Sequence, residues 1–128
     1  MTRVLLLEDS EDVLYLFQIE LEWLGYEVDA ATDGEAALAA AKRTPPDVIV
    51  SDLSMPDMDG FEFIQRVRKL PSLYSVPAIA LTGSGMNKDV QRALASGFTA
   101  HLTKPLEVRE LVDRIEGLTA RCLQRKAG

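Results

Sequence analysis

Short apolar runs of this sequence end in polar side chains of types that could bind a metal ion or phosphate. These residues are Glu8 and Asp9, Asp52, Thr82, and Lys104. In an open α/β sheet, the carboxyl ends of the strands converge on one crevice, and ligands bind there. We therefore expect the five residues, although far apart in the sequence, to form a single site.

The chemistry open to such a site follows from its charges. Glu8, Asp9 and Asp52 would place three carboxylates in one crevice, where like charges raise a pKa or recruit a cation, and we expect Lys104 to offset only one of them. A few carboxylates plus water, with room for phosphate oxygens, is how proteins usually hold Mg²⁺. A carboxylate can also attack phosphorus to give an aspartyl phosphate, with Lys104 and the Thr82 hydroxyl stabilising the phosphoryl oxygens.

The hydrophobic pattern predicts the elements that must position these residues. Short apolar or β-leaning runs alternate with longer segments of helical period. Strands are expected at 4–7, 28–31, 48–50, 77–81 and 99–103, and helices at 12–24, 34–42, 61–70, 87–95 and from 107 to 118 or beyond. This alternation predicts an α/β fold with a mostly parallel sheet and helices on both faces.

The length and composition of the chain fit one acidic domain. It has 128 residues, 47% of them hydrophobic, which is ample for a single core. We expect one domain over residues 1–128, with its core at about 3–118 and a C-terminal helical tail at 119–128. Lys and Arg number 14 against 20 Asp and Glu, and the net charge of −6 argues against a nucleic-acid-binding surface.

The cysteine content and the lengths of the apolar runs indicate where in the cell the protein is located. Cys122 is the only cysteine, so neither an intramolecular disulfide nor a zinc site of several cysteines can form. The apolar run at 4–7 is too short for a signal peptide or a membrane span. We expect a soluble, cytoplasmic protein that does not associate with membranes.

Four stretches of the sequence carry a resemblance to a known family. They are Leu7-Glu8-Asp9-Ser10, Ser51-Asp52-Leu53-Ser54-Met55-Pro56-Asp57-Met58-Asp59-Gly60, Leu81-Thr82-Gly83 and Thr103-Lys104-Pro105. In this order and spacing, the chain resembles a response-regulator receiver domain of two-component signal transduction, in the CheY-like superfamily, over about residues 3–118. The resemblance implies a flavodoxin-like, doubly wound, five-stranded parallel sheet of order 2-1-3-4-5 with five helices.

The same resemblance implies a role for each site residue. Asp52 is implied as the acceptor of a phosphoryl group from the phosphohistidine of a sensor histidine kinase or a histidine phosphotransfer protein. Thr82 and Lys104 are implied to contact phosphoryl oxygens, and the peptide bond between Lys104 and Pro105 is implied to be cis. The implied ligands of Mg²⁺ are Glu8, Asp9, Asp52 and the backbone carbonyl of Ser54. Asp57, Asp59 and Gly60 are expected to form only a turn and a helix cap.

The sequence departs from the family pattern at the residue that relays phosphorylation. The family uses a side chain three positions before its lysine, usually Tyr or Phe, and this chain has His101 there. One hypothesis is that His101 still acts as this relay, but that its response to phosphorylation is weaker or depends on pH, because imidazole is smaller and titrates near neutral pH. The alternative is an ordinary strand histidine. The resemblance also implies that phosphorylation shifts residues 83–86. It further implies a partner surface on the fourth helix, fifth strand and fifth helix, which a homodimer could use.

Other functions stay open at this point. A phosphorylation-independent receiver would act only as a protein-binding module, although the complete set of acids, Thr and Lys speaks against it. A hydrolase that forms an aspartyl phosphate usually needs a second Asp two residues after the nucleophile, where this chain has Ser54. The hypothesis of a flavin-binding site has less support than either of these, because aromatic residues are scarce near the strand ends. We expect a signalling domain that catalyses only its own phosphorylation and slow dephosphorylation; Trp23 receives no functional assignment.

Overall fold

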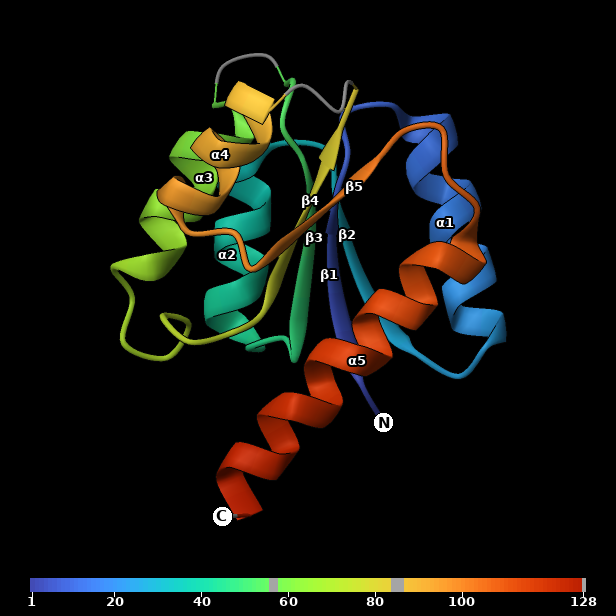
Figure 1. Ribbon diagram of the computed structural model, residues 1–128. Coiled ribbons are helices and arrows are strands. Elements are labelled where there is room, and N and C mark those ends of the chain that lie inside the picture. Colours follow the sequence, from blue (N-terminus) through green and yellow to red (C-terminus); the bar gives the residue numbers. More distant parts are fainter. Residues whose placement is uncertain (56–57, 84–86, 128) are drawn as a thin grey trace.

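Five parallel strands form one sheet of order β2-β1-β3-β4-β5 in the computed structural model, which describes residues 1–55, 58–83 and 87–127 (Figure 1). Helices alternate with the strands along the chain. The strands are β1 (Arg3–Leu7), β2 (Glu27–Ala31), β3 (Val48–Asp52), β4 (Ala78–Thr82) and β5 (Ala100–Thr103). The helices are α1 (Glu11–Trp23), α2 (Gly34–Arg43), α3 (Gly60–Arg68), α4 (Asn87–Ser96) and α5 (Val108–Ala127).

The helices cover both faces of the sheet because its central strands are apolar on both sides. Alternate residues of a strand point to opposite faces, so Val4 and Leu6 of β1 pack with residues of α1 and α5, whereas Leu5 and Leu7 pack with residues of α2, α3 and α4. Figure 1 shows the same division of helices between the two sides of the sheet. Strand β3 lies between β1 and β4 and is buried along its whole length. This packing fixes the ends of β1 and β3 side by side.

Side-chain caps begin three of the helices. Ser10 caps α1, Asp33 caps α2 and Asp59 caps α3, each by accepting a hydrogen bond from the backbone N–H three residues further on. Gly25 follows α1 with a φ of 98°, a left-handed conformation that favours glycine. The caps on α1 and α3 set where the loops after β1 and β3 enter their helices.

The predicted fold class and strand order are confirmed, while several element boundaries differ by a few residues. Strand β3 extends to Asp52 instead of ending at 50, because Ser51 and Asp52 continue the ladder opposite Ala80 and Leu81. Helix α5 continues past 118 to Ala127. None of the helices in the described ranges combines the length and the hydropathy needed to cross a bilayer.

Candidate functional site

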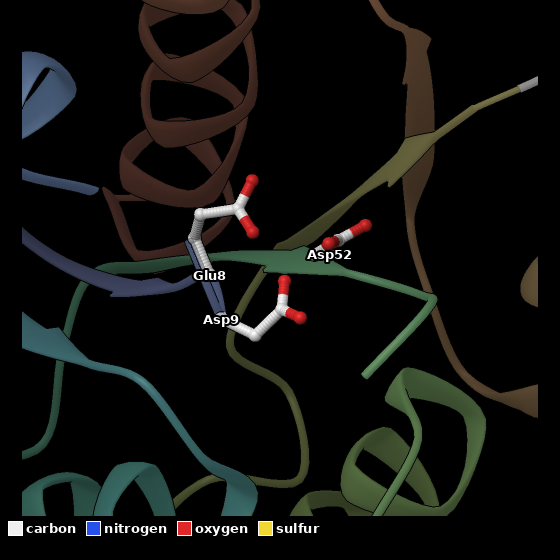
Figure 2. A group of neighbouring side chains, drawn as sticks. All are labelled: Glu8, Asp9 and Asp52. Atoms are coloured by element: carbon white, nitrogen blue, oxygen red, sulfur yellow. The ribbon is translucent and has the colours of Figure 1, made fainter. Parts of the chain in front are cut away.

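The acidic residues at the strand ends lie together at the carboxyl edge of the sheet. Glu8 and Asp9 directly follow β1, and Asp52 is the last residue of β3, which pairs with β1. Figure 2 shows their carboxylates turned toward one common space. One oxygen of each residue lies within 4.8 Å of the oxygens of the other two. The three carboxylates therefore form one cluster.

Lys104 contacts two members of this cluster. Its Nζ is 2.7 Å from Glu8 Oε1 and 3.3 Å from Asp52 Oδ2. Glu8 is 2% exposed and Asp52 6% exposed, so the ammonium bridges two buried carboxylates, either of which would be costly to leave without a partner. Lys104 therefore contacts two carboxylates, although its single positive charge offsets only one negative charge. The Lys104 backbone N–H donates to the Thr82 carbonyl at 2.8 Å, and the Lys104–Pro105 peptide bond is cis, as predicted.

The electrostatics of the cluster are uneven. Asp9 is exposed, yet a hydrogen bond with Glu8, partial burial and the charge of Glu8 together raise the pKa of Asp9. Burial acts to lower the pKa of Lys104, but the hydrogen bond to Glu8 and the charge of Asp52 outweigh burial and raise that pKa. Lys104 is therefore charged at neutral pH, and Asp9 carries the carboxylate that the protein alone compensates least.

The donor set suits a hard divalent cation. Carboxylate oxygens are the ligands that Mg²⁺ prefers in proteins, with waters completing its octahedron. Three carboxylates facing one ammonium leave an excess of negative charge, and the raised pKa of Asp9 reflects that excess. Ser54 lies two residues beyond the end of β3, with its N–H 3.4 Å from Asp52 Oδ1. The residues present therefore fit a magnesium ion beside Asp9.

Thr82 ends β4 and is 2% exposed. Its Oγ1 donates to the Leu102 carbonyl at 3.5 Å, which is at the long limit for a hydrogen bond. Such a weak bond can be exchanged for a better acceptor at low cost. Thr82 also lines, with Ser54 and Gly83, a hollow of about 240 Å³ beyond the ends of β3 and β4. The hydroxyl therefore has both an exchangeable partner and space for a small ligand nearby.

His101 lies in β5, opposite Ala80 of β4, and is partly buried. The adjacent residues Ala100 and Leu102 pack on the side of α1 and α5, so strand alternation puts His101 on the opposite face, the one that α4 covers. The next residue, Leu102, supplies the carbonyl that accepts from Thr82. Residues 84–86, which were expected to shift on phosphorylation, lie outside the described residues, as does Asp57.

Gly60 has a role at the site that the sequence interpretation missed. A Cβ at this position would lie 2.5 Å from the Asp52 carbonyl oxygen and 2.8 Å from Leu53 Cα, too close to fit without a shift of the backbone. The Gly60 N–H also donates to the Leu53 carbonyl at 3.1 Å. Helix α3 thus packs directly on the backbone that carries Asp52, and only glycine permits that approach. The available signal was a poor helix former at the first position after the Asp59 cap.

The comparisons with known proteins agree on a family. Residues 4–116 match the family described as the response regulator receiver domain. A Leptolyngbya boryana protein, described as an uncharacterized 14.6 kDa protein in the sodA1 3' region, is 42% identical over 113 residues, or 88% of this chain and 86% of that protein. The DNA-binding dual master transcriptional regulator RpaA of Synechocystis is 36% identical over 94% of this chain, which spans 50% of the regulator. The structure of the Vibrio cholerae chemotaxis protein CheY4 has a TM-score of 0.87 at 36% identity, covering 91% of this chain and 97% of that one.

This chain belongs to the response regulator receiver domain family and is a receiver domain of two-component signal transduction. Receiver domains are signalling domains rather than classical enzymes, and membership implies interaction with a histidine kinase or a histidine phosphotransfer protein. Receiver domains bind Mg²⁺ at an acidic pocket, and the cluster of Glu8, Asp9 and Asp52 is a group that could hold a metal ion.

Proposed function

We propose that Asp52 accepts a phosphoryl group from a partner's phosphohistidine and that the resulting acyl phosphate switches a protein-interaction surface. The observation that carries this proposal is the position of Lys104, which joins the buried carboxylates of Glu8 and Asp52 while Asp9 lies close by. A carboxylate held beside an ammonium, at the edge of a sheet where ligands bind, supports a role as the phosphoryl acceptor.

The reaction forms one bond and breaks one. An oxygen of Asp52 attacks phosphorus, and a P–O bond forms as the P–N bond of the phosphohistidine breaks. The electron pair of that bond stays on the imidazole, which leaves as the neutral ring when its other nitrogen carries a proton. Lys104, kept charged because its pKa is raised, pairs with a phosphoryl oxygen. Thr82 exchanges its 3.5 Å bond to the Leu102 carbonyl for a second phosphoryl oxygen.

Glu8, Asp9, Asp52 and the backbone carbonyl of Ser54 would hold Mg²⁺ at this site. The bound ion would neutralise charge on the phosphoryl oxygens. The chain's own contribution is to keep Glu8 and Asp52 buried and fixed by Lys104, with Asp9 exposed beside them. The same site would catalyse only the chain's own phosphorylation and its slow dephosphorylation.

The effect of phosphorylation would reach the partner surface through β5. Exchange of the Thr82 hydrogen bond frees the carbonyl of Leu102, the neighbour of His101 on the strand. His101 is the proposed switch, and the proposed partner surface is the face made by α4, β5 and α5, which a homodimer could also use. A cytoplasmic location, and a domain core over about residues 3–118 with a helical tail at 119–128, complete the proposal.

The test is phosphorylation of wild type and Asp52→Asn by phosphoramidate with Mg²⁺, followed by intact mass and by peptide mapping. The wild type should gain the mass of one phosphoryl group at Asp52, and the variant should gain none. Asp113→Asn, which removes an exposed carboxylate of α5, is the matched control and should be labelled like the wild type.

The outcome also separates the alternatives. Equal labelling of Asp52→Asn at the same rate would overturn the assignment of the acceptor. Absence of labelling in the wild type, together with no Mg²⁺-dependent binding of beryllofluoride, would indicate a phosphorylation-independent binding module instead. Rapid turnover of small phosphomonoesters would indicate a hydrolase.

A further inference from the structure

The hollow of about 240 Å³ beyond the ends of β3 and β4 lies beside the proposed phosphoryl acceptor. The residues that line it are Leu53, Ser54, Phe61, Thr82, Gly83 and Asp89. The Ser54 N–H is 3.4 Å from Asp52 Oδ1, whereas the Lys104 ammonium contacts Asp52 Oδ2. The hollow therefore adjoins the carboxylate on its Oδ1 side, and a space of this size has room for several water molecules.

Phe61 gives this hollow an aromatic wall. It is the second residue of α3 and follows Gly60, whose close approach fixes that end of the helix to the backbone of Asp52. Phe61 is partly buried and packs against the core on this face of the sheet. Among the described residues that line the hollow it is the only aromatic one, whereas three of the others carry a hydroxyl or a carboxylate. The ring therefore fills space beside the acceptor without offering a hydrogen bond that would hold a water molecule there.

Arg92 holds the ring of Phe61 from the neighbouring helix. Its guanidinium carbon, Cζ, lies 3.9 Å from the centroid of the ring, which is a cation–π contact. Figure 1 shows α3 and α4 side by side on one face of the sheet. Arg92 is exposed, so the contact orders the ring without burying a charge. The position of the ring is thus set both by the core and by Arg92.

We infer that Phe61, held by Arg92, limits the access of water to the acyl phosphate of Asp52 and so lengthens the lifetime of the phosphorylated state. This role depends on the proposed phosphorylation of Asp52. It makes Phe61 a positioning residue, because the ring acts through the water that it excludes and takes no part in the bond changes.

The step that Phe61 would slow is hydrolysis. A water oxygen attacks phosphorus, the P–O bond to Asp52 breaks, and the electron pair of that bond returns to the carboxylate. One proton of the water passes to solvent, and hydrogen phosphate leaves. Attack on phosphorus is roughly in line with the bond that breaks, so only a few positions of the water are productive. A wall that excludes water from one side of the site removes some of those positions and protects the intermediate.

The test measures loss of the phosphoryl group from the full chain. The protein is phosphorylated by phosphoramidate with Mg²⁺, the phosphoramidate is removed by desalting, and intact mass follows the fraction that remains phosphorylated. Phe61→Ala opens the wall and should raise the rate constant of dephosphorylation by about fivefold or more. Phe61→Leu keeps an apolar side chain of intermediate size and should raise it less.

Substitutions of Arg92 test the same wall from outside the core. Arg92→Met removes the cation but keeps an unbranched apolar side chain, and it should raise the rate constant by about two- to threefold. Arg92→Lys keeps a cation for the ring and should stay close to the wild-type value. Because Arg92 is exposed, these variants decide the question even if Phe61→Ala does not fold.

Two matched controls separate water access from a general loss of stability. Phe17→Ala removes a partly buried phenylalanine of α1 from the opposite face of the sheet, and Arg114→Met removes an exposed arginine of α5. Urea unfolding should show that Phe17→Ala destabilises the protein, as Phe61→Ala does. Both controls should nevertheless keep the rate constant of dephosphorylation within about 1.5-fold of the wild-type value.

Three results would contradict this role of Phe61. The first is a wild type labelled at Asp52 whose Phe61→Ala and Arg92→Met variants lose the phosphoryl group at the wild-type rate, which would leave the proposed function intact. The second is an equal acceleration in Phe17→Ala and Phe61→Ala, because a general loosening of the fold would then explain both. The third is a wild type that is not labelled at all, which would overturn the proposed function as well.

Discussion

Of the three site carboxylates, Asp9 is the one that the protein itself compensates least. Glu8 and Asp52 are buried against Lys104, whereas Asp9 is exposed and makes no salt bridge within the described part of the chain. The hydrogen bond and the charge of Glu8 both favour the protonated form of Asp9. Glu8 and Asp52 thus form the fixed part of the cluster with Lys104, and Asp9 carries the charge whose compensation is weakest.

Asp9→Asn should raise the free energy of unfolding in the absence of Mg²⁺, by at most about 1 kcal/mol because solvent screens this exposed charge. The pKa of Asp9 is raised in the folded state, so the folded protein binds this proton more tightly than the unfolded chain does. Stability therefore falls as the pH rises from the ordinary value of 3.8 through the raised pKa. The gain in the variant should be largest above the raised pKa of Asp9 and absent below pH 3.8, as measured by urea unfolding.

The control for this effect is Asp113→Asn, which removes one negative charge from α5 away from the cluster. It should leave stability within about 0.5 kcal/mol at both pH values. If Asp9→Asn lowered stability at neutral pH without Mg²⁺, the repulsion argued for Asp9 and Glu8 would be wrong.

Gly60→Ala should distort the site by displacing the backbone that carries Asp52. The added Cβ has to displace the Asp52 carbonyl and Leu53, at a cost of about 1–3 kcal/mol, and should slow phosphorylation of Asp52. Gly117→Ala in α5 is the matched control, since a Cβ there meets nothing within 4 Å, and it should stabilise the protein by about 0.5–1 kcal/mol. Chemical denaturation and labelling rates measure both effects. A neutral Gly60→Ala would contradict the close packing of α3 on β3.

How far the site could be predicted depended on the kind of residue. Glu8, Asp52, Thr82 and Lys104 could be predicted because a strand end is a local property of the sequence. That Lys104 joins two carboxylates could not, since it depends on how a loop 96 residues away from Glu8 directs one flexible side chain. The close approach of Gly60 to the backbone of Asp52 could not be predicted from the sequence pattern either, because it is a contact between two backbone segments.

At the scale of elements, periodicity predicted the alternation of strands and helices, but the order of the strands came from the family resemblance. Nothing in the pattern of β2 says that it lies at the edge beside β1. In the structure Arg3 of β1 pairs with Glu27 and Asp29 of β2, at 2.8 Å and 3.1 Å. Glu27 and Asp29 lie on an edge strand, where charged side chains discourage pairing with another sheet. They are consistent with the position of β2 but could not have assigned it.

Arg68 ties three elements together. From the end of α3, its Nε donates to the Gly97 carbonyl after α4 at 2.9 Å, and its Nη1 donates to the Val76 carbonyl before β4 at 2.6 Å. The same Nη1 also approaches the carbonyls of Leu73 and Tyr74. Burial lowers the pKa of Arg68, although guanidinium remains charged throughout the ordinary pH range. This clamp holds the loops that lead into β4 and β5, the strands that carry Thr82 and His101.

Arg68→Met should therefore lower the free energy of unfolding by about 2–4 kcal/mol, because it leaves carbonyls without their charged donor. Arg68→Lys should lose less, since an ammonium keeps the charge but not the planar set of donors. Arg66→Met is the control, because Arg66 lies two residues earlier in α3, is exposed and pairs with Glu35 and Glu62 at the surface. It should cost no more than about 0.5 kcal/mol. Equal losses for Arg66→Met and Arg68→Met in urea unfolding would contradict the clamp.

At the scale of the whole molecule, charge couples the site to folding. The chain carries a net charge of −6, and folding brings three of its carboxylates within 4.8 Å of one another. In the unfolded chain Asp52 is far along the sequence from the adjacent residues Glu8 and Asp9, and the three groups have no shared geometry. A divalent cation that needs all three therefore binds the folded state alone, and its binding energy adds to stability.

Mg²⁺ at about a hundred times its dissociation constant should add about 2.7 kcal/mol to the free energy of unfolding, which for a domain of this size is a rise of roughly 10 °C in Tm. Differential scanning calorimetry at neutral pH measures the rise, and NaCl at equal ionic strength is the control for screening. Glu8→Gln and Asp9→Asn should each reduce the rise, and EDTA should reverse it. Because a proton competes with the metal at Asp9, the rise should shrink as the pH falls through the raised pKa of that residue. A rise of the same size with NaCl, or in both variants, would mean that the ion acts outside the cluster.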